Sequence, residues 1–358
     1  MNASPFSEVP IKRTTDSAEQ VTVKSSAIAT PASNDGGEDW LAHFTAGIVS
    51  AAELQSIALP HHAPLLGEWF AEADLGFVFA ARGVGKTHLC LGLARALAEG
   101  SSIGPWHARD AVRVLYVDGE MNAEQIRERD AALAKCAGTL DYLNHELLFH
   151  RTEKTLNLTR KECQDALTAL CIQRGVRVLF LDNLSCLFSG IAENDNDAWE
   201  AVLPWLLHLR KRNVAVVIVA HAGRNGQMRG ASRREDSAAW TLRLDDAIDA
   251  ATVKRGAKFV STFTKPSRHT PTETPAYEWE FSPDASGRCE VVFREASGLE
   301  VFLQWLRDGL DSCKDIAEAM GVSKGTVSKL AKRAEAAGRI HNNGQKYSLT
   351  DGNETPKK

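Results

Sequence analysis

The sequence predicts an α/β fold with a mostly parallel sheet, helices on both faces of that sheet, and a smaller second domain at the C-terminus. Apolar, β-branched runs alternate with helical segments from residue 76 onward, which is typical of strands that are buried on both faces. A chain of 358 residues is long enough for one domain of ordinary size and a smaller one. The runs are 77–80 (FVFA), 112–118 (VRVLYVD), 176–182 (VRVLFLD) and 214–221 (VAVVIVAH).

Two N-terminal segments precede the first run. Residues 1–38 are rich in Ser, Thr, Ala and Pro, so we expect a disordered tail that buries too little apolar surface to fold. Residues 39–75 combine helical patterns with Pro60, Pro64 and an apolar turn. We expect a helical adaptor there that packs beside the sheet-containing domain, and a flexible tail at 351–358.

The composition limits the kinds of partner and compartment. A net charge of -4 with mixed signs excludes a polycation, so any contact with nucleic acid must come from local basic patches. The seven cysteines form no CxxC pair and no zinc-ligand spacing, which favours buried thiols in a reducing cytoplasm. No signal-peptide core is present, and no window approaches the roughly 18 apolar residues of a membrane span. We therefore expect a soluble, cytoplasmic protein that does not contact a membrane.

The segment 77–88, FVFAARGVGKTH, combines a strand, a small-residue loop and the start of a helix. Gly83 and Gly85 would let backbone N–H groups converge on a phosphate, and Lys86 would place a cation against its oxygens. Thr87 would offer a hydroxyl to Mg²⁺. The loop therefore predicts binding of ATP and Mg²⁺. The residues expected to contact the nucleotide are Ala81, Arg82, Gly83, Val84, Gly85, Lys86, Thr87 and His88.

One residue of this loop departs from the GxxxxGK[ST] pattern, since Ala80 stands where the first glycine is usual. Alanine is small, and we expect it to be tolerated. An ordinary turn between a strand and a helix could also read GKT. The apolar run before the loop and the amphipathic helix after Lys86 favour the phosphate site, because that helix directs its N-terminal N–H groups at the same anion.

Polar residues follow the other apolar runs, at the end of a parallel sheet where ligands bind. Asp182 has the position and type of the residue that holds the Mg²⁺ water shell opposite Thr87, although an Asp there could also cap a helix. Glu120, after Asp118, could orient and deprotonate the attacking water, or be an exposed residue at a helix N-terminus. His221 could sense the γ-phosphate or be purely structural.

Beyond Asp245 the pattern changes to shorter, alternating runs. These are 259–265 (FVSTFTK), 277–281 (YEWEF) and 289–293 (CEVVF). Such runs suit an antiparallel edge of the same sheet. We therefore place the end of the first domain, which begins at residue 76, at residue 297.

Taken together, the GKT loop, the DGEM turn, LDNLS, and AH with MRGAS resemble the RecA-type ATPase superfamily. Within it, the chain is most similar to the RepA-type hexameric replicative helicases of plasmids, and more distantly to the DnaB-type helicases. The resemblance covers roughly residues 65–293. It implies a RecA-like P-loop ATPase core over 76–297 and assembly into a homo-hexamer that hydrolyses ATP.

The resemblance also implies roles for single residues. DGEM looks like the SLEM turn of such helicases, which marks Glu120 as the catalytic base, and AH marks His221 as the strand-end sensor. MRGAS is similar to their RGSS segment, which implies that Arg229 acts as an arginine finger on the neighbouring subunit. Lys265 and Arg268 are an alternative finger pair, although the KxR pattern of DnaB-type proteins reads TKPSR here.

Two loops would face a central channel in such a ring, namely 186–198 and 223–234. Only the second loop is basic. It could hold a single DNA strand through contacts to the phosphate backbone, without reading the sequence of bases.

Residues 298–350 are similar to a winged helix-turn-helix. Helical patterns at 301–310 and 313–320 precede Ser323, which would cap a third helix, and the residues around Asn342-Asn343-Gly344 predict a hairpin. The third helix places Lys and Ser residues opposite its apolar face. We expect these side chains to bind duplex DNA, although such modules also dock proteins. They are Lys324, Ser328, Lys329 and Lys332, together with Lys346 on the hairpin.

The sequence thus favours an ATP-driven DNA helicase or translocase that serves plasmid or mobile-element replication. A single strand would pass through the ring, while the winged helix would recruit the protein to duplex DNA, to a replication initiator or to a primase. The alternative is a DNA-binding regulator or adaptor that uses ATP as a switch and does not unwind DNA. A nucleotide kinase is disfavoured, since we identify no separate lid or acceptor pocket.

Overall fold

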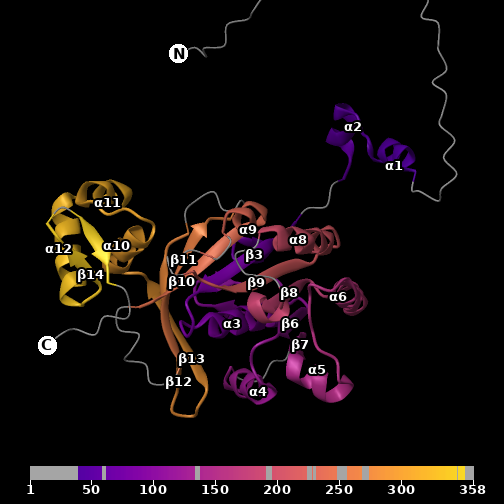
Figure 1. Cartoon of the computed structure of the whole chain (residues 1–358), viewed down its shortest axis with the longest axis horizontal. Helices are drawn as coiled ribbons and strands as arrows, with labels where there is room; N and C mark the ends of the chain where they lie inside the picture. The colour runs from indigo at the N-terminus through magenta and orange to yellow at the C-terminus, as the bar shows by residue number, and fades with distance from the viewer. Residues whose placement is uncertain are drawn as a thin grey trace, which may run out of the picture. The chain divides into compact units, whose positions relative to one another are not determined.

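The computed structural model describes residues 39–58, 62–133, 138–190, 196–223, 228, 231–247, 256–267, 274–344 and 346–350 (Figure 1). The chain divides into two compact units, Met1–Pro60 and His61–Lys358. Each unit is described by itself below. The tail predicted at 1–38 and the tail predicted at 351–358 both lie outside the described residues.

The first unit contains two short helices, α1 (Trp40–Gly47) and α2 (Ala51–Ser56). The Asp39 carboxylate accepts a hydrogen bond from the backbone N–H of Ala42, and Ser50 caps the second helix in the same way, which satisfies otherwise unpaired N–H groups. Neither helix contains a buried residue. The helical pattern predicted for this part of the adaptor is confirmed.

The rest of the expected helical adaptor is not helical, which corrects the prediction for residues 64–75. Those residues form a hairpin of β1 (Pro64–Leu66) and β2 (Phe70–Ala71) and then enter the central sheet. Trp69 and Phe70 are 2% and 1% exposed, and both pack edge-to-face on Trp240. This aromatic packing stabilises the hairpin as part of the domain core.

A nine-stranded sheet forms the centre of the second unit, in the order β13-β12-β11-β10-β3-β9-β8-β6-β7. The six strands from β10 to β7 in this order are parallel to one another, and the three at the other edge are antiparallel. The sequence predicts this antiparallel edge and four of the parallel strands, but not β7 and β10. The strands are β3 (Leu75–Ala80), β6 (Val114–Asp118), β7 (Leu140–Asn144), β8 (Val178–Asp182), β9 (Ala215–His221), β10 (Trp240–Asp246), β11 (Ala257–Lys265), β12 (Tyr277–Pro283) and β13 (Cys289–Glu295). A separate small pair joins β4 (Ser102–Ile103) and β5 (Trp106–His107).

Both faces of this sheet are buried. Val78 and Ala80 of β3 belong to one apolar cluster with helix α3, whereas Phe77 and Phe79 belong to a second cluster with helices α6 and α8. The alternation along one strand is what a sheet between two helical layers requires. The helices are α3 (Lys86–Glu99), α4 (Ala123–Ala132), α5 (His145–Thr152), α6 (Lys161–Arg174), α7 (Leu184–Leu187), α8 (Asn196–Lys211) and α9 (Ala231–Ser237).

Three helices and a hairpin follow β13, where the sequence predicts them. They are α10 (Gly298–Arg307), α11 (Cys313–Ala319), α12 (Lys324–Ala336), β14 (Ile340–Asn342) and β15 (Tyr347–Leu349). Phe302, Ile316 and Val327 are fully buried in a separate apolar cluster. We call residues 298–350 the C-terminal segment.

Buried ion pairs connect the C-terminal segment to the sheet. The Arg243 guanidinium of β10, which is 1% exposed, lies 3.0 Å from the Asp245 carboxylate and 3.1 Å from the Asp308 carboxylate. Arg307 of α10 lies 3.4 Å from the other Asp245 oxygen. Since breaking a buried pair leaves an uncompensated charge, these contacts fix the start of the C-terminal segment against β10.

No helix among the described residues is long and apolar enough to cross a membrane. The six cysteines within the same ranges are free thiols. Cys90 and Cys171 are buried as expected, whereas Cys186 is exposed, which corrects the prediction for that residue.

The closest backbone approach in the core yields a testable prediction. A Cβ at Gly76 would lie 2.1 Å from Cζ2 of Trp240, which is fully buried. We expect Gly76→Ala to lower the free energy of unfolding by about 2 kcal/mol or more, as overpacking does. Gly325→Ala in α12 is the matched control, since its Cβ would meet only Ser323 Oγ at 3.7 Å. Urea unfolding measures both, and equal stability of the two variants would contradict the prediction.

Candidate nucleotide-binding site

The loop between β3 and α3 has the backbone that the sequence predicts for a phosphate cradle. Gly83 and Gly85 have φ angles of +83° and +122°, which side chains rarely adopt. A Cβ at Gly85 would also lie 2.7 Å from the Cβ of Ala257. Ala80 is the last residue of β3 and is fully buried, so alanine is accommodated at the position where the pattern has glycine.

Lys86 begins α3 and is 7% exposed. Its Nζ donates to the carbonyl oxygens of Ala80 at 3.1 Å and Ala81 at 2.8 Å. Burial lowers the pKa of Lys86, and the carboxylates of Asp182 and Glu120 oppose that shift. No side chain caps the helix at this end, so its N-terminal dipole remains directed at an anion in the loop.

Asp182 ends β8 and is 2% exposed. The Tyr116 hydroxyl donates to Asp182 Oδ2 at 2.6 Å, and the Thr87 side chain forms another hydrogen bond to this carboxylate. Burial raises the pKa of the Asp182 carboxyl, and these two hydrogen bonds oppose the shift. The structure therefore brings the Thr87 and Asp182 side chains into direct contact; their shared role at Mg²⁺ stays a prediction.

These residues fit Mg²⁺. This ion prefers oxygen ligands and is usually held by one or two carboxylates together with substrate phosphates and water. The structure brings together the Thr87 hydroxyl and the Asp182 carboxylate at the phosphate loop. Within the described ranges, no three His, Cys, Asp or Glu side chains are grouped to hold a metal by themselves. The donor set suits an ion shared with the nucleotide.

The two carboxylates after β6 have different environments. Asp118 is 1% exposed and accepts hydrogen bonds from the Met121 N–H at 3.2 Å and from Asn144 Nδ2 at 2.7 Å. Its role is to fix the DGEM turn. Glu120 is exposed and lines the cleft beside Lys86, where a carboxylate can reach a water molecule.

Asn183 connects two predicted site residues and was missed in the sequence. Its Nδ2 donates to the Glu120 carboxylate and lies 3.4 Å from Nε2 of His221. The side chain therefore spans the ends of β6, β8 and β9. The only signal in the sequence is an amide directly after Asp182, which by itself reads as a helix cap, and Asn183 does cap α7.

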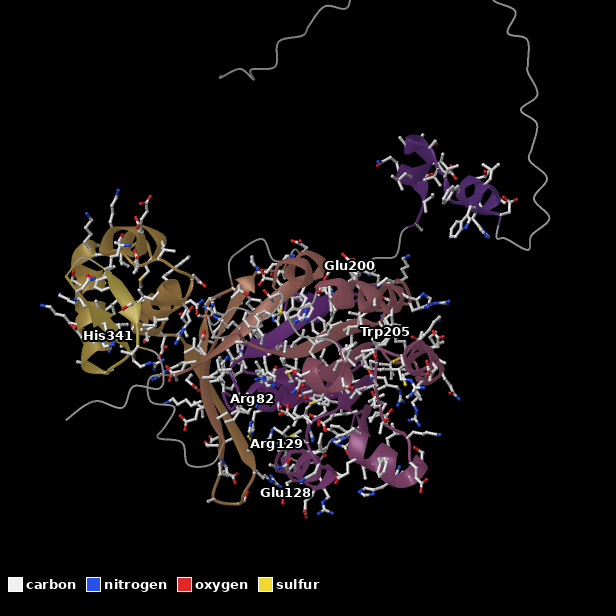
Figure 2. The ribbon with its side chains drawn as sticks, viewed as in Figure 1. Arg82, Glu128, Arg129, Glu200, Trp205 and His341 are labelled. Carbon is white, nitrogen blue, oxygen red and sulfur yellow. The ribbon has the colours of Figure 1, made fainter. Side chains whose placement is uncertain are left out.

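A cleft of about 480 Å³ is lined by residues of the phosphate loop, Glu120 and His221, whereas Asp182 and Asn183 do not line it. Figure 2 labels Arg82 and Arg129, which both line it. Eight of its residues were predicted as site residues, and four were not. The predicted ones are Arg82, Gly83, Gly85, Lys86, Thr87, His88, Glu120 and His221, and the others are Met121, Gln125, Arg129 and Gly256.

Among the described residues, no arginine-finger candidate lines this cleft. Arg229 and Arg268 lie outside those residues. Lys265 ends β11, where its Nζ donates to the Glu235 carbonyl oxygen, and it does not line the cleft. These candidates remain predictions.

The predicted DNA-binding side chains lie on the C-terminal segment. Lys324, Ser328, Lys329 and Lys332 are exposed on α12, as predicted. Lys346 precedes β15 and forms an ion pair with Asp311 at 2.7 Å. Part of its charge is thus already compensated within the segment.

The Asp118 carboxyl predicts a pH dependence of stability. Burial, followed by the charge of Asp182, raises the pKa of Asp118 from 3.8 to about 7. The folded protein therefore keeps a proton that the unfolded chain releases, and the free energy of unfolding falls as the pH rises from about 4 to about 7. We expect this group to contribute roughly 1–4 kcal/mol over that window.

The measurement is urea unfolding at several pH values from about 4 to about 8. Asp118→Asn should make the free energy of unfolding less dependent on pH, because the amide is uncharged like the protonated carboxyl but does not titrate. Asp110→Asn, at an exposed position, is the control and should leave the fall unchanged. An equal slope in Asp118→Asn and the parent protein would show that Asp118 is ionised throughout.

Comparison with protein-family models matches residues 41–227 to an AAA domain family. Among curated proteins, no match was found. One similar solved structure is a KaiC-like protein of the hyperthermophilic archaeon Pyrococcus horikoshii OT3, with 14% identity, a TM-score of 0.43, and coverage of 63% of this chain and 91% of that one. Another is the flagellar accessory protein FlaH of Methanocaldococcus jannaschii, with 13% identity and the same TM-score and coverage of both chains.

At this level of similarity, the two solved structures add nothing to the argument, and the fold rests on the strand order and the family match. The matched range 41–227 is more than half of the 358 residues and contains β3 with the phosphate loop, Glu120, Asp182 and His221. The chain belongs to the AAA domain family, and its phosphate loop is that of a P-loop ATPase.

Proposed function

We propose that this ATPase is a RepA-like motor that moves along single-stranded DNA during plasmid or mobile-element replication. The observation that carries the proposal is the position of Glu120. Its carboxylate lines the same cleft as Lys86, receives a hydrogen bond from Asn183, and has His221 as a neighbour of that amide. A site with a held carboxylate beside the phosphate cradle is equipped for hydrolysis as well as for binding.

The chemistry is in-line attack of water on the γ-phosphorus of ATP, with cleavage of its bond to the β–γ bridging oxygen, which leaves on ADP. Glu120 orients the water and accepts its proton, while Lys86 stabilises the negative charge that develops on the phosphate oxygens. Mg²⁺, held through Thr87 and Asp182, would neutralise charge on the β and γ oxygens. His221 can respond to the γ-phosphate through Asn183, which contacts both His221 and Glu120.

The ring remains part of the proposal. Hydrolysis would occur between subunits of a homo-hexamer, with Arg229 of one subunit acting on the nucleotide of the next, and with Lys265 and Arg268 as the alternative pair. The basic loop 223–234 would contact the single strand in the channel. The exposed lysines of α12 support contact with duplex DNA, because phosphate contacts need cations on an accessible face. An initiator or a primase is the expected protein partner.

The alternative function is a DNA-binding regulator that uses ATP as a switch and does not unwind DNA. One observation favours it. The pairs between Arg243, Asp245 and Asp308 join the C-terminal segment to β10, and β10 pairs with the phosphate-loop strand β3 up to Ala80. Such a connection could pass the state of the site to the DNA-binding face without any translocation.

Steady-state ATP hydrolysis with no DNA, with single-stranded DNA and with duplex DNA tests the proposal. We expect single-stranded DNA to raise the rate of ATP hydrolysis, because a motor that translocates along DNA hydrolyses ATP as it moves. Glu120→Gln should lower the rate by roughly 10²–10⁴-fold, the range for loss of a general base, while ATP binding persists. Lys86→Ala is the blank, because it removes the phosphate-binding cation.

The same measurement separates the two functions. A rate that does not respond to single strands, together with ATP-dependent binding to duplex DNA, would favour the regulator. Hydrolysis that persists unchanged in Glu120→Gln would show that another group activates the water.

Subunit mixing tests the ring. Lys86→Ala chains cannot bind the phosphates and Arg229→Ala chains lack the finger, so we expect each to be inactive alone. Mixed assemblies should regain part of the activity, because a Lys86→Ala chain still offers Arg229 to the nucleotide of its neighbour. Full activity of Arg229→Ala alone would exclude this finger, and Lys265→Ala would then be tested in its place.

A further inference from the structure

The strand β13 forms one edge of the nine-stranded sheet, and no strand among the described residues pairs with its outer side. It lies on a hairpin with β12, which Figure 1 shows projecting from the rest of the sheet. All seven residues of Cys289–Glu295 pair with β12 in a register without a shift. An edge strand of this length, without proline or a bulge, offers a row of backbone N–H and C=O groups to another strand.

The hydrogen bonds to β12 show which backbone groups of β13 point outward. The Ala296 N–H donates to the Ala276 carbonyl oxygen at 2.8 Å, and the Asp284 N–H donates to the Arg288 carbonyl oxygen at 2.7 Å. Along an antiparallel pair, hydrogen-bonded residues alternate with residues whose N–H and C=O groups face away. The even-numbered residues of β13 therefore bond to β12. The outward groups belong to Cys289, Val291, Phe293 and Glu295.

Two apolar side chains near the centre of β13 are exposed. Val292 is 51% exposed and Phe293 is 41% exposed. Successive side chains of a strand point to opposite faces, so each face of the sheet has apolar surface at this edge. The Phe293 ring lies 5.9 Å from the buried Trp279 ring, so it extends the buried aromatic cluster to the edge. Covering these two side chains would remove apolar surface from water.

Two charges of β13 flank Val292. Glu290 lies two residues before it and Arg294 two residues after it, so the three side chains share one face of the strand. The Arg294 side chain is 68% exposed and donates to the Glu278 carboxylate of β12 at 2.7 Å. A guanidinium has five N–H donors, so Arg294 can bind a second carboxylate as well. Glu290 is exposed and can supply that carboxylate from another chain.

We propose that β13 pairs with β13 of a second copy of this chain, antiparallel and about a two-fold axis at Val292. In this register Val292 faces the partner's Val292, Glu290 faces the partner's Arg294, and Val291 faces the partner's Phe293. The charge pair and the mixed apolar pair each occur twice, because the contact is symmetric. The outward N–H and C=O groups of Val291 and Phe293 then meet in hydrogen-bonded pairs, as an antiparallel ladder requires.

The neighbouring registers are less favourable. Registers that keep the outward groups opposite each other shift the two-fold axis by one residue at a time. An axis at Val291 would place Glu290 opposite Val292, and an axis at Phe293 would place Arg294 opposite Val292. An axis at Glu290 or at Arg294 would place like charges opposite each other, which destabilises a cross-strand pair. Of these axes, the one at Val292 alone pairs Glu290 with Arg294.

This contact goes beyond the proposed function and does not depend on it. It uses neither the phosphate loop nor the residues assigned to the arginine finger. A two-fold contact joins the same surface of both chains, whereas a ring joins two different surfaces. One strand of seven residues per chain is a small contact beside the roughly 1,200–2,000 Å² of a standard interface. We therefore expect weak association that depends on protein concentration.

A disulfide across the axis tests the register. In a non-hydrogen-bonded antiparallel pair the two Cα atoms lie about 4.5 Å apart, which a disulfide can bridge. Val292→Cys, in the full chain with Cys289→Ser, should therefore form an intermolecular disulfide with itself on oxidation. Glu290→Cys in the same background is the matched control, because the two Glu290 positions would lie about 13 Å apart along the strands. Mass spectrometry of the peptides identifies the bridge.

We expect Val292→Cys to form the bridge at least about tenfold faster than Glu290→Cys, since only its two thiols are held within reach. Both positions are exposed, so both variants should fold as the parent chain does. Equal rates for the two variants, or no bridge in Val292→Cys, would overturn the pairing.

Hydrogen exchange of peptides from β13 identifies what covers the edge. The outward amides of Val291 and Phe293 should exchange more slowly at about 100 µM protein than at about 1 µM, a range that spans a weak contact. Val292→Lys should abolish this difference, because it places two lysines opposite each other on the axis. Ala285→Lys adds the same charge at an exposed position of the hairpin turn and should retain the difference.

The dependence on concentration separates a second copy from other occupants of the edge. Equal protection of these amides at both concentrations would indicate a segment of the same chain and would overturn the contact between copies. Rapid exchange at both concentrations would overturn it as well, because the edge would then be uncovered.

Discussion

The burial of one carboxylate organises the nucleotide site. Asp182 is 2% exposed, and a buried carboxylate requires hydrogen bonds to remain charged. Tyr116 and Thr87 supply them, which fixes Thr87 at the first turn of α3. The backbone carbonyl oxygen of Asp182 accepts a hydrogen bond from the Gly119 N–H at 2.7 Å, so Asp182 also holds the turn that carries Glu120. This single residue therefore aligns the phosphate loop, the Mg²⁺ ligands and the candidate base.

The strand order explains why these groups meet. β9 lies between β3 and β8, and β8 lies between β9 and β6. Their carboxyl ends are adjacent because all four strands are parallel. Asn183 can then contact Glu120 on one side and His221 on the other. On the far side of β3, β10 carries Arg243, whose pairs with Asp245 and Asp308 attach the C-terminal segment.

Features with a local cause could be predicted from the sequence. The phosphate loop depends on glycines that reach positive φ, and the buried parallel strands are continuous apolar runs. Features with a distant cause were missed. β10 carries the charged Arg243, whose burial is compensated by Asp245 and by the distant Asp308. β7 is a partly exposed strand without an apolar run. The hairpin at Trp69 was expected only as an apolar turn within a helical adaptor, since no local pattern in the sequence indicates its contact with Trp240. The contacts of Asn183 and Asp118 depend on the register between β6 and β8, which no local pattern in the sequence specifies.

The aromatic residues form a continuous chain through the core. Trp69 contacts Trp240 at 4.8 Å and Trp106 at 5.0 Å, and Trp106 contacts Trp279 at 4.9 Å. Trp279 lies 6.3 Å from Phe281, the ring that adjoins His88. Four of the eight tryptophans of the chain thus lie in one group. The intrinsic fluorescence of the protein will be weighted toward this region, which gives the unlabelled molecule an optical signal next to its nucleotide site.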